Sequence, residues 1–170
     1  MTSFVALLRA VNVGGTGKLA MGDLRALCER AGFEDVRTYL QSGNVVFRST
    51  RSEREVKAAL ERALGARMGK PVAVLVRAGA ELASVLARNP FPGAEPSRVV
   101  VLFLDVAPRR EVLAGLAIPG REAVVPRGRE LFIHYPDGIG RSKLRVPLAE
   151  SGTGRNLNTV ARLAEMATER

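Results

Sequence analysis

Four short segments carry the residue types and spacing that suit ligand chemistry. The first runs from Arg9 to Lys18 and contains Asn12, Gly14 and Gly15. Glycines let backbone N–H groups approach an anion closely, and a following helix adds the positive end of its dipole. The segment misses the spacing of both the Walker A loop and the dinucleotide fingerprint. Two interpretations remain: an anion-binding loop, or a flexible connection whose glycines serve turn geometry.

The second segment, 41–44, holds Ser42 and Asn44 at the tip of an expected hairpin. Ser, Gly and Asn favour tight turns, so a plain turn explains them, although a hydroxyl and an amide would also suit a ligand. An RNA-recognition strand would follow its glycine with several aromatic residues, whereas here only Phe47 is aromatic. The segment therefore argues against an RNA-stacking platform.

The third segment, 134–145, combines glycines with cations where a strand is expected to end and a helix to begin. Its candidate ligand-binding residues are Tyr135, Arg141, Ser142 and Lys143. A helix from about 141 to 149 would direct its N-terminal dipole at a phosphate or carboxylate beside the cationic side chains. The alternative is a solvated helix that begins with ordinary surface charges.

The fourth segment, 152–159, precedes the expected C-terminal helix. Thr153 or Asn156 can cap that helix through a side-chain oxygen, which explains much of the segment without any ligand. Arg155 is not explained by a cap. We therefore include Arg155 and Asn156 among the candidate ligand-binding residues.

The standard catalytic sets are mostly absent. His134 is the one histidine and Cys28 the one cysteine, so the sequence predicts neither a metal site nor a disulfide framework. Cys28 falls on the apolar stripe of its expected helix and is interpreted as a core residue. A Ser-His-Asp set would have to use His134, yet no Gly-x-Ser-x-Gly elbow occurs. The residues define no catalytic set and no cofactor, and they leave open whether the chain is an enzyme.

The charge balance first suggests nucleic acid as a partner. The 170 residues include 26 Lys or Arg and 17 Asp or Glu, a formal net charge of +9. The excess is spread along the chain without a dense basic block, and nearly all of it is Arg, which also fits a compositional bias. A hydrophobic content of 46% excludes a disordered chain, and no apolar run is long enough for a membrane span. With a single cysteine, a cytoplasmic location is the simplest expectation.

Apolar periodicity predicts the elements that position these segments. Strands at 4–8, 36–40, 44–47 and 72–76, with helices at 21–31 and after Ser52, give the ferredoxin-like order βαββαβ. A helix at 80–88 and a proline-rich stretch come next. The second half is expected to contain a strand at 99–104, a helix after Pro108, a hairpin at 122–135, the short helix at 141–149 and a helix at 156–168.

The predicted fold class is therefore α+β, with two ferredoxin-like-related βαββα units and an extra C-terminal helix. The repeated element order suggests an internal duplication. The expected domains are a ferredoxin-like unit at 1–78, a helix and Pro-rich linker at 79–97, and a second α+β unit at 98–170.

At the same four segments the chain resembles a bacterial family known as domain of unknown function 1697. The matching text is LRAVNVGG at 8–15, YLQSGNVVF at 39–47, HYPDGIGRSKL at 134–144 and TGRNLNTV at 153–160. The resemblance implies an α+β protein of two ferredoxin-related parts, and it implies little about function because the family has no established activity. Two positions depart from its pattern: Thr16 stands where members often carry Lys, and Leu157 where Trp is usual.

The leading hypothesis is that the protein binds a small anionic or phosphorylated, nucleotide-like ligand in a cleft between the two halves. The predicted ligand-binding residues are Arg9, Asn12, Gly14, Gly15, Lys18, Ser42, Asn44, Tyr135, Arg141, Ser142, Lys143, Arg155 and Asn156. One alternative is a nucleic-acid-binding module with an Arg-rich surface, and another is a homodimeric structural or regulatory protein. No membrane partner is expected, and the sequence does not determine the oligomeric state.

Overall fold

The computed structural model describes residues 1–12 and 18–169 of the chain. These residues form two compact units. The first comprises Met1–Ala83 with the C-terminal residues from Arg162 on, and the second comprises Ser84–Ala161. The domain boundaries predicted from sequence, at 78 and 97, stay a prediction. Among the described helices, none is both long and apolar enough to cross a membrane.

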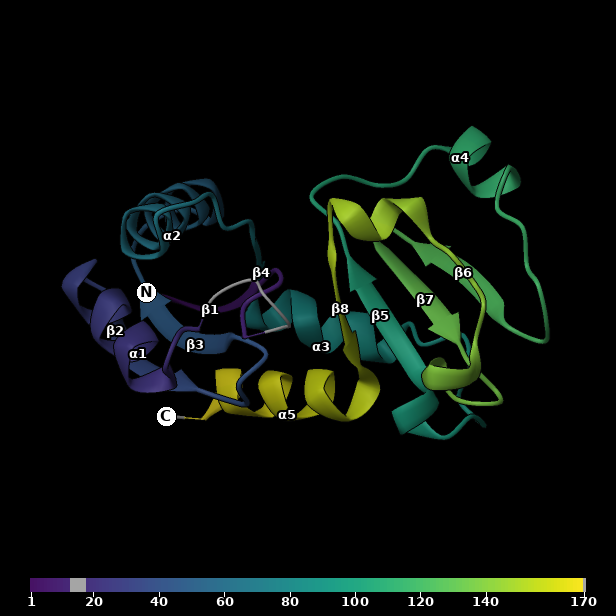
Figure 1. The fold of residues 1–170 in the computed structure, drawn as a ribbon. Coiled ribbons are helices and arrows are strands. Elements are labelled where there is room, and N and C mark those ends of the chain that lie inside the picture. Colours follow the sequence, from purple (N-terminus) through teal and green to yellow (C-terminus); the bar gives the residue numbers. More distant parts are fainter. Residues whose placement is uncertain (13–17, 170) are drawn as a thin grey trace. The chain divides into compact units, whose positions relative to one another are not determined.

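The first unit contains a four-stranded antiparallel sheet in the order β2-β3-β1-β4 (Figure 1). Its strands are β1 (Thr2–Leu8), β2 (Glu34–Thr38), β3 (Asn44–Ser49) and β4 (Val74–Ala78). Two helices connect them, α1 (Met21–Arg30) after the first strand and α2 (Glu53–Met68) after the third. This is the ferredoxin-like order that the sequence predicts, with β4 beginning two residues later than expected.

Helix α2 has the ends that its sequence indicates. The Ser52 hydroxyl accepts a hydrogen bond from the Glu55 N–H at 3.2 Å, and the Glu55 carboxylate accepts one from the Ser52 N–H at 3.1 Å. These two bonds form a capping box. Gly69 ends the helix with a φ of 72°, a left-handed conformation that glycine adopts at little cost.

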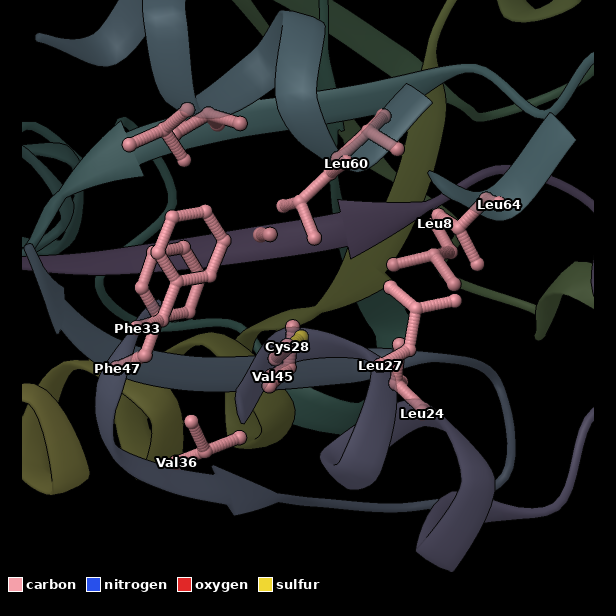
Figure 2. Packing of buried hydrophobic residues seen from close by; sticks show 14 of the residues in the cluster. Leu8, Leu24, Leu27, Cys28, Phe33, Val36, Val45, Phe47, Leu60 and Leu64 are labelled. Carbon is pink, nitrogen blue, oxygen red and sulfur yellow. The ribbon is translucent and has the colours of Figure 1, made fainter. Parts of the chain in front are cut away.

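The core of the first unit lies between α1, α2 and one face of the sheet (Figure 2). Phe33 and Phe47 stack there with ring centroids 4.4 Å apart, and Leu24, Leu60 and neighbouring aliphatic side chains fill the remaining space. Cys28 belongs to this cluster and is fully buried, as its place on the apolar stripe predicts. Burial, with a smaller contribution from Glu29, raises the pKa of its thiol to about 12.

The second unit repeats the same strand order in a second antiparallel sheet, β6-β7-β5-β8. Its strands are β5 (Val99–Phe103), β6 (Ala123–Arg127), β7 (Glu130–His134) and β8 (Thr153–Asn156). The helices along this part of the chain are α3 (Gly79–Ala87), α4 (Arg110–Ala114) and α5 (Leu157–Thr168). The fold is therefore α+β with two similar sheets, as predicted, and the internal duplication stays a prediction.

The predicted helix at 141–149 is wrong. Two short 3-10 turns, Ile139–Arg141 and Pro147–Glu150, flank an extended stretch in its place. Along this stretch burial alternates with a period of two, and Leu144, Val146 and Leu148 pack on the core of the second sheet. Pro147 also disfavours a helical Val146, whose φ and ψ are -116° and 100°.

Strand β8 is absent from the sequence-based prediction, which assigned its residues to a loop and cap before the last helix. The cap itself is confirmed: Asn156 Oδ1 accepts a hydrogen bond from the Thr159 N–H at 3.0 Å at the start of α5. The strand forms because β5 offers a free edge, on which Thr153 pairs with Phe103 and Asn156 with Val100. A long-range partner thus overrides the weak strand propensity of glycine and asparagine.

Gly43 gives a test of the hairpin between β2 and β3. Its φ is 89°, and a Cβ there would lie 2.7 Å from Val11 Cγ2 and 2.9 Å from Leu8 Cβ. We expect Gly43→Ala to lower the free energy of unfolding by about 2–4 kcal/mol through backbone strain and overpacking. Urea denaturation of both proteins measures this difference.

Gly22→Ala is the matched control, because a Cβ on Gly22 meets nothing within 4 Å and the residue lies in helix α1. The control is expected to keep or slightly raise stability, by up to about 1 kcal/mol. Equal stability of Gly43→Ala and the wild type would contradict the packing described for the hairpin.

Cys28 reports on the integrity of the first core. Since the thiolate is the reactive form and burial disfavours it, we expect Ellman's reagent at pH 8 to label the native protein very slowly. In denaturing guanidinium the single thiol should react completely. Rapid labelling under native conditions would show that α1 is not packed as described.

Candidate functional site

In the first unit, Asn12 connects two loops at one end of the sheet. Its amide nitrogen donates to the backbone oxygens of Leu19, at 2.9 Å, and Gln41, at 2.8 Å. Its Oδ1 accepts from the Leu19 N–H at 2.7 Å. Asn12 thereby ties the two ends of the glycine-rich segment together and to the β2–β3 turn. The amide that the sequence nominates for a ligand is engaged in holding the backbone.

Asn44 has a comparable role at the start of β3. The residue is fully buried, and its amide nitrogen donates to the Tyr39 carbonyl at 2.6 Å and to Ser42 Oγ at 3.0 Å. These bonds fix the turn that the pattern Gln-Ser-Gly-Asn predicts. Ligand binding by Asn44 and Ser42 stays a prediction, and the described contacts already account for both side chains.

The remaining predicted residues of this unit are differently placed. Arg9 is half-buried and its N–H bonds the Ala73 carbonyl at 2.9 Å, while Lys18 is exposed. Gly14 and Gly15 lie outside the described residues. The backbone near Asn12 is strained, since Ala10, Asn12 and Leu40 all have positive φ values, of 54°, 56° and 62°.

In the second unit, a pocket of about 160 Å³ brings together four of the predicted ligand-binding residues. They are Tyr135, Arg141, Ser142 and Lys143. The opposite wall is the segment 119–122, which precedes β6 and which the sequence did not nominate. The complete lining is Pro119, Gly120, Arg121, Glu122, Tyr135, Pro136, Asp137, Gly138, Arg141, Ser142 and Lys143.

The hairpin of β6 and β7 explains why these two walls face each other. Ala123 pairs with His134, so continuation of the same register brings Glu122 opposite Tyr135. This register can be derived from the sequence. If Gly128 and Arg129 form the two-residue turn of the hairpin, the paired residues follow by counting outward from the turn in both directions. Arg121 and Glu122 could have been nominated in this way.

The wall at 135–142 is shaped by backbone hydrogen bonds. The Tyr135 N–H donates to the Arg98 carbonyl at 2.8 Å, and the Gly138 N–H to the Tyr135 carbonyl at 3.0 Å. The N–H groups of Arg141 and Ser142 close the next turn. Since these N–H groups have intramolecular partners and no α-helix follows, the predicted helix dipole is absent. The cationic side chains are what this wall offers an anion.

One ion pair bridges the two walls at the rim. Arg121 donates from Nε to Asp137 Oδ2 at 3.3 Å, and its Nη2 also bonds Asp137 Oδ1. This hydrogen bonding, with the nearby charges of Arg121, Arg98 and Arg141, holds the pKa of Asp137 below its ordinary value of 3.8. Asp137 thus stays ionised and engaged with Arg121 at neutral pH.

Arg141 and Lys143 are exposed, and within residues 1–12 and 18–169 neither side chain forms a salt bridge. Tyr135 is 7% exposed and lines the same pocket. Burial, and secondly the Glu122 carboxylate, raise the pKa of its hydroxyl, which is therefore a neutral hydrogen-bonding group. The pocket consequently combines available cations with a neutral donor.

Arg155 and Asn156 are not among the residues that line the pocket. Arg155 is buried on β8, where its Nη1 donates to Thr153 Oγ1 at 2.7 Å and to the Gly154 carbonyl at 3.0 Å. Desolvation by this burial lowers the pKa of its guanidinium to about 10. Asn156 is engaged as the cap of α5. Their role in ligand binding stays a prediction.

The described residues contain no cluster of three or more His, Cys, Asp or Glu side chains that could hold a metal ion. The ring of His134 lies against Phe91, with centroids 5.4 Å apart.

Two four-stranded sheets with the same strand order, one with a small pocket at its end, define the chain as a two-unit α+β protein whose first unit has the ferredoxin-like element order. Comparison with known proteins narrows this class. The chain belongs to the family described as protein of unknown function (DUF1697), whose model matches residues 1–132. The pocket wall at 135–143 follows the matched residues.

A solved structure extends the likeness to both units. The conserved bacterial protein SP0830 from Streptococcus pneumoniae is 23% identical, with a TM-score of 0.82, over 98% of this chain and 99% of that one. This likeness shows that the two proteins share a fold. None of the curated proteins matches the chain.

The Arg121–Asp137 pair can be tested by titration. We expect the Asp137 carboxyl to titrate below 3.8, and Arg121→Gln to return its pKa toward that value. Because the pKa of Asp137 is lower in the folded protein than in the unfolded chain, the pair stabilises the fold at pH values above the unfolded-state pKa. This stabilisation is lost as the pH falls through the folded-state pKa. Carboxyl carbon NMR shifts from pH 2 to 7 measure both proteins, and unchanged Asp137 titration in the variant would contradict the pairing.

Proposed function

We propose that the pocket of the second unit binds a small ligand through an anionic group, a phosphate or a carboxylate. The supporting observation is that Tyr135, Arg141, Ser142 and Lys143, which the sequence nominates as one segment, line a pocket that the separate segment 119–122 completes. Charge-assisted hydrogen bonds from arginine and lysine are the strongest contacts proteins make to such groups.

The size of the pocket limits what enters it. Typical ligand sites measure about 300–1,000 Å³, whereas this pocket measures about 160 Å³. It therefore accommodates the anionic head and a few further atoms, and any larger body of the ligand lies outside. A nucleotide-like body, like a cytoplasmic location for the protein, stays a prediction.

Each lining residue has a defined part in this proposal. Arg141 and Lys143 supply the positive charge, since neither forms a salt bridge within the part of the chain that the structure describes. The Ser142 hydroxyl accepts from the Leu144 N–H at 3.1 Å and retains its own proton for donation. Arg121 neutralises Asp137, which would otherwise repel the ligand.

The proposal is tested by NMR titration of the isotope-labelled protein with inorganic phosphate and with AMP. We expect amide shifts at 120–122 and 135–143, and at least a tenfold weaker affinity in Arg141→Gln/Lys143→Gln, because each lost charge-assisted contact costs about 1.5–3 kcal/mol. Circular dichroism checks that the variant is folded.

Arg145→Gln is the matched control. Arg145 is exposed on the same extended stretch but does not line the pocket, so its loss lowers the net charge without changing the site. We expect nearly unchanged affinity in this variant. Equal weakening by Arg145→Gln, or shifts confined to other parts of the chain, would refute the pocket as the site.

A further inference from the structure

We infer that this pocket selects ligands that carry an ammonium group close to the anionic group, with Glu122 as the residue that binds the ammonium. The inference rests on the proposed function, because it assumes that Arg141 and Lys143 hold the anionic group. It adds a substrate class: small zwitterions in which the two charged groups are separated by a short chain.

The position of the Glu122 carboxylate is the first argument. Glu122 is half-buried and lines the pocket, and the carboxylate lies over Gly120 on the same wall. A Cβ built on Gly120 would be 2.9 Å from Glu122 Oε2 and 3.3 Å from Oε1. The carboxylate therefore lies beside Gly120, and both residues line the pocket.

Charge accounting on the pocket walls is the second argument. Asp137 and Arg121 form an ion pair and neutralise each other, so neither charge needs a partner from a ligand. Within the described residues, Glu122 forms no ion pair and Arg141 and Lys143 form none. A purely anionic ligand would satisfy the two cations and leave Glu122 facing a like charge, which disfavours it. An ammonium group removes that repulsion and adds a charge-assisted hydrogen bond.

The surroundings of Tyr135 are the third argument. Burial raises the pKa of its hydroxyl, and the charge of the nearby Glu122 carboxylate adds to the effect. Glu122 and Tyr135 lie on facing walls of a cavity of about 160 Å³, a volume that holds both ends of a short zwitterion. Arg141 and Lys143 lie on the same segment as Tyr135, opposite the wall that carries Glu122.

A matched ligand pair tests the inference directly. O-phosphoethanolamine and ethyl phosphate are nearly the same size and carry the same phosphate, but only the first has an ammonium group. We expect the wild type to bind O-phosphoethanolamine about tenfold more tightly, measured as dissociation constants by NMR titration at one ionic strength. In Glu122→Gln the preference should fall to about twofold or less, while ethyl phosphate binds at least as well as before.

Glu111→Gln is the control, because Glu111 is an exposed carboxylate in α4 that does not line the pocket. It should keep the full preference. Equal affinity of the wild type for both ligands would overturn the inference and leave the proposed anion site intact. A preference that survives Glu122→Gln would also overturn it, and binding of neither ligand would refute the proposed function itself. The wild-type comparison decides between these outcomes even if a variant fails to fold.

Discussion

The pairing register of the β6–β7 hairpin is the constraint on which the candidate site depends. Ala123 faces His134 across the hairpin, so the chain before β6 and the chain after β7 leave the sheet side by side. A slip of one residue would exchange the two faces of both strands and separate Glu122 from Tyr135. Gly128, with a φ of 62° in the turn, and the buried faces of Leu131 and Ile133 together fix this register.

The two sheets share a strand order but differ at the connection between the third and fourth strands. In the first unit this connection is α2, a sixteen-residue helix that covers the sheet. In the second it is an extended stretch whose Leu144, Val146 and Leu148 cover the sheet instead. Because an extended chain exposes every second side chain, the stretch covers the core with one set of residues and presents Lys143 and Arg145 to solvent with the other, next to Arg141 in the preceding turn. The absence of a helix here is what leaves cationic side chains beside the pocket.

Much of the fold could be predicted from sequence because the first unit consists of local signals. The apolar runs of β1 and β4, the capping box at Ser52 and the turn at 41–44 each indicate their own element. The predicted helix at 141–149 is wrong. Its charged residues and leucines suit a helix, but Leu144, Val146 and Leu148 alternate with the period of an extended chain. Strand β8 was missed because its pairing with β5 is non-local and Thr-Gly-Arg-Asn has little strand propensity of its own.

The same contrast separates residues that build the fold from residues available to a ligand. Asn12, Gly43 and Asn44 look functional in sequence because polar and glycine residues interrupt apolar runs, yet the structure accounts for each: two amides bond backbone carbonyls, and the glycine fits against Leu8 and Val11. Arg155 and Asn156 are likewise engaged, one buried and bonded to the Thr153 hydroxyl and the Gly154 carbonyl, and one as a helix cap. Arg141 and Lys143 differ, since no ion pair in the described part of the chain uses them. A motif residue that the fold does not need is better evidence for a ligand than one that it does, and for Arg141 and Lys143 this criterion supports the site that we propose in the second unit.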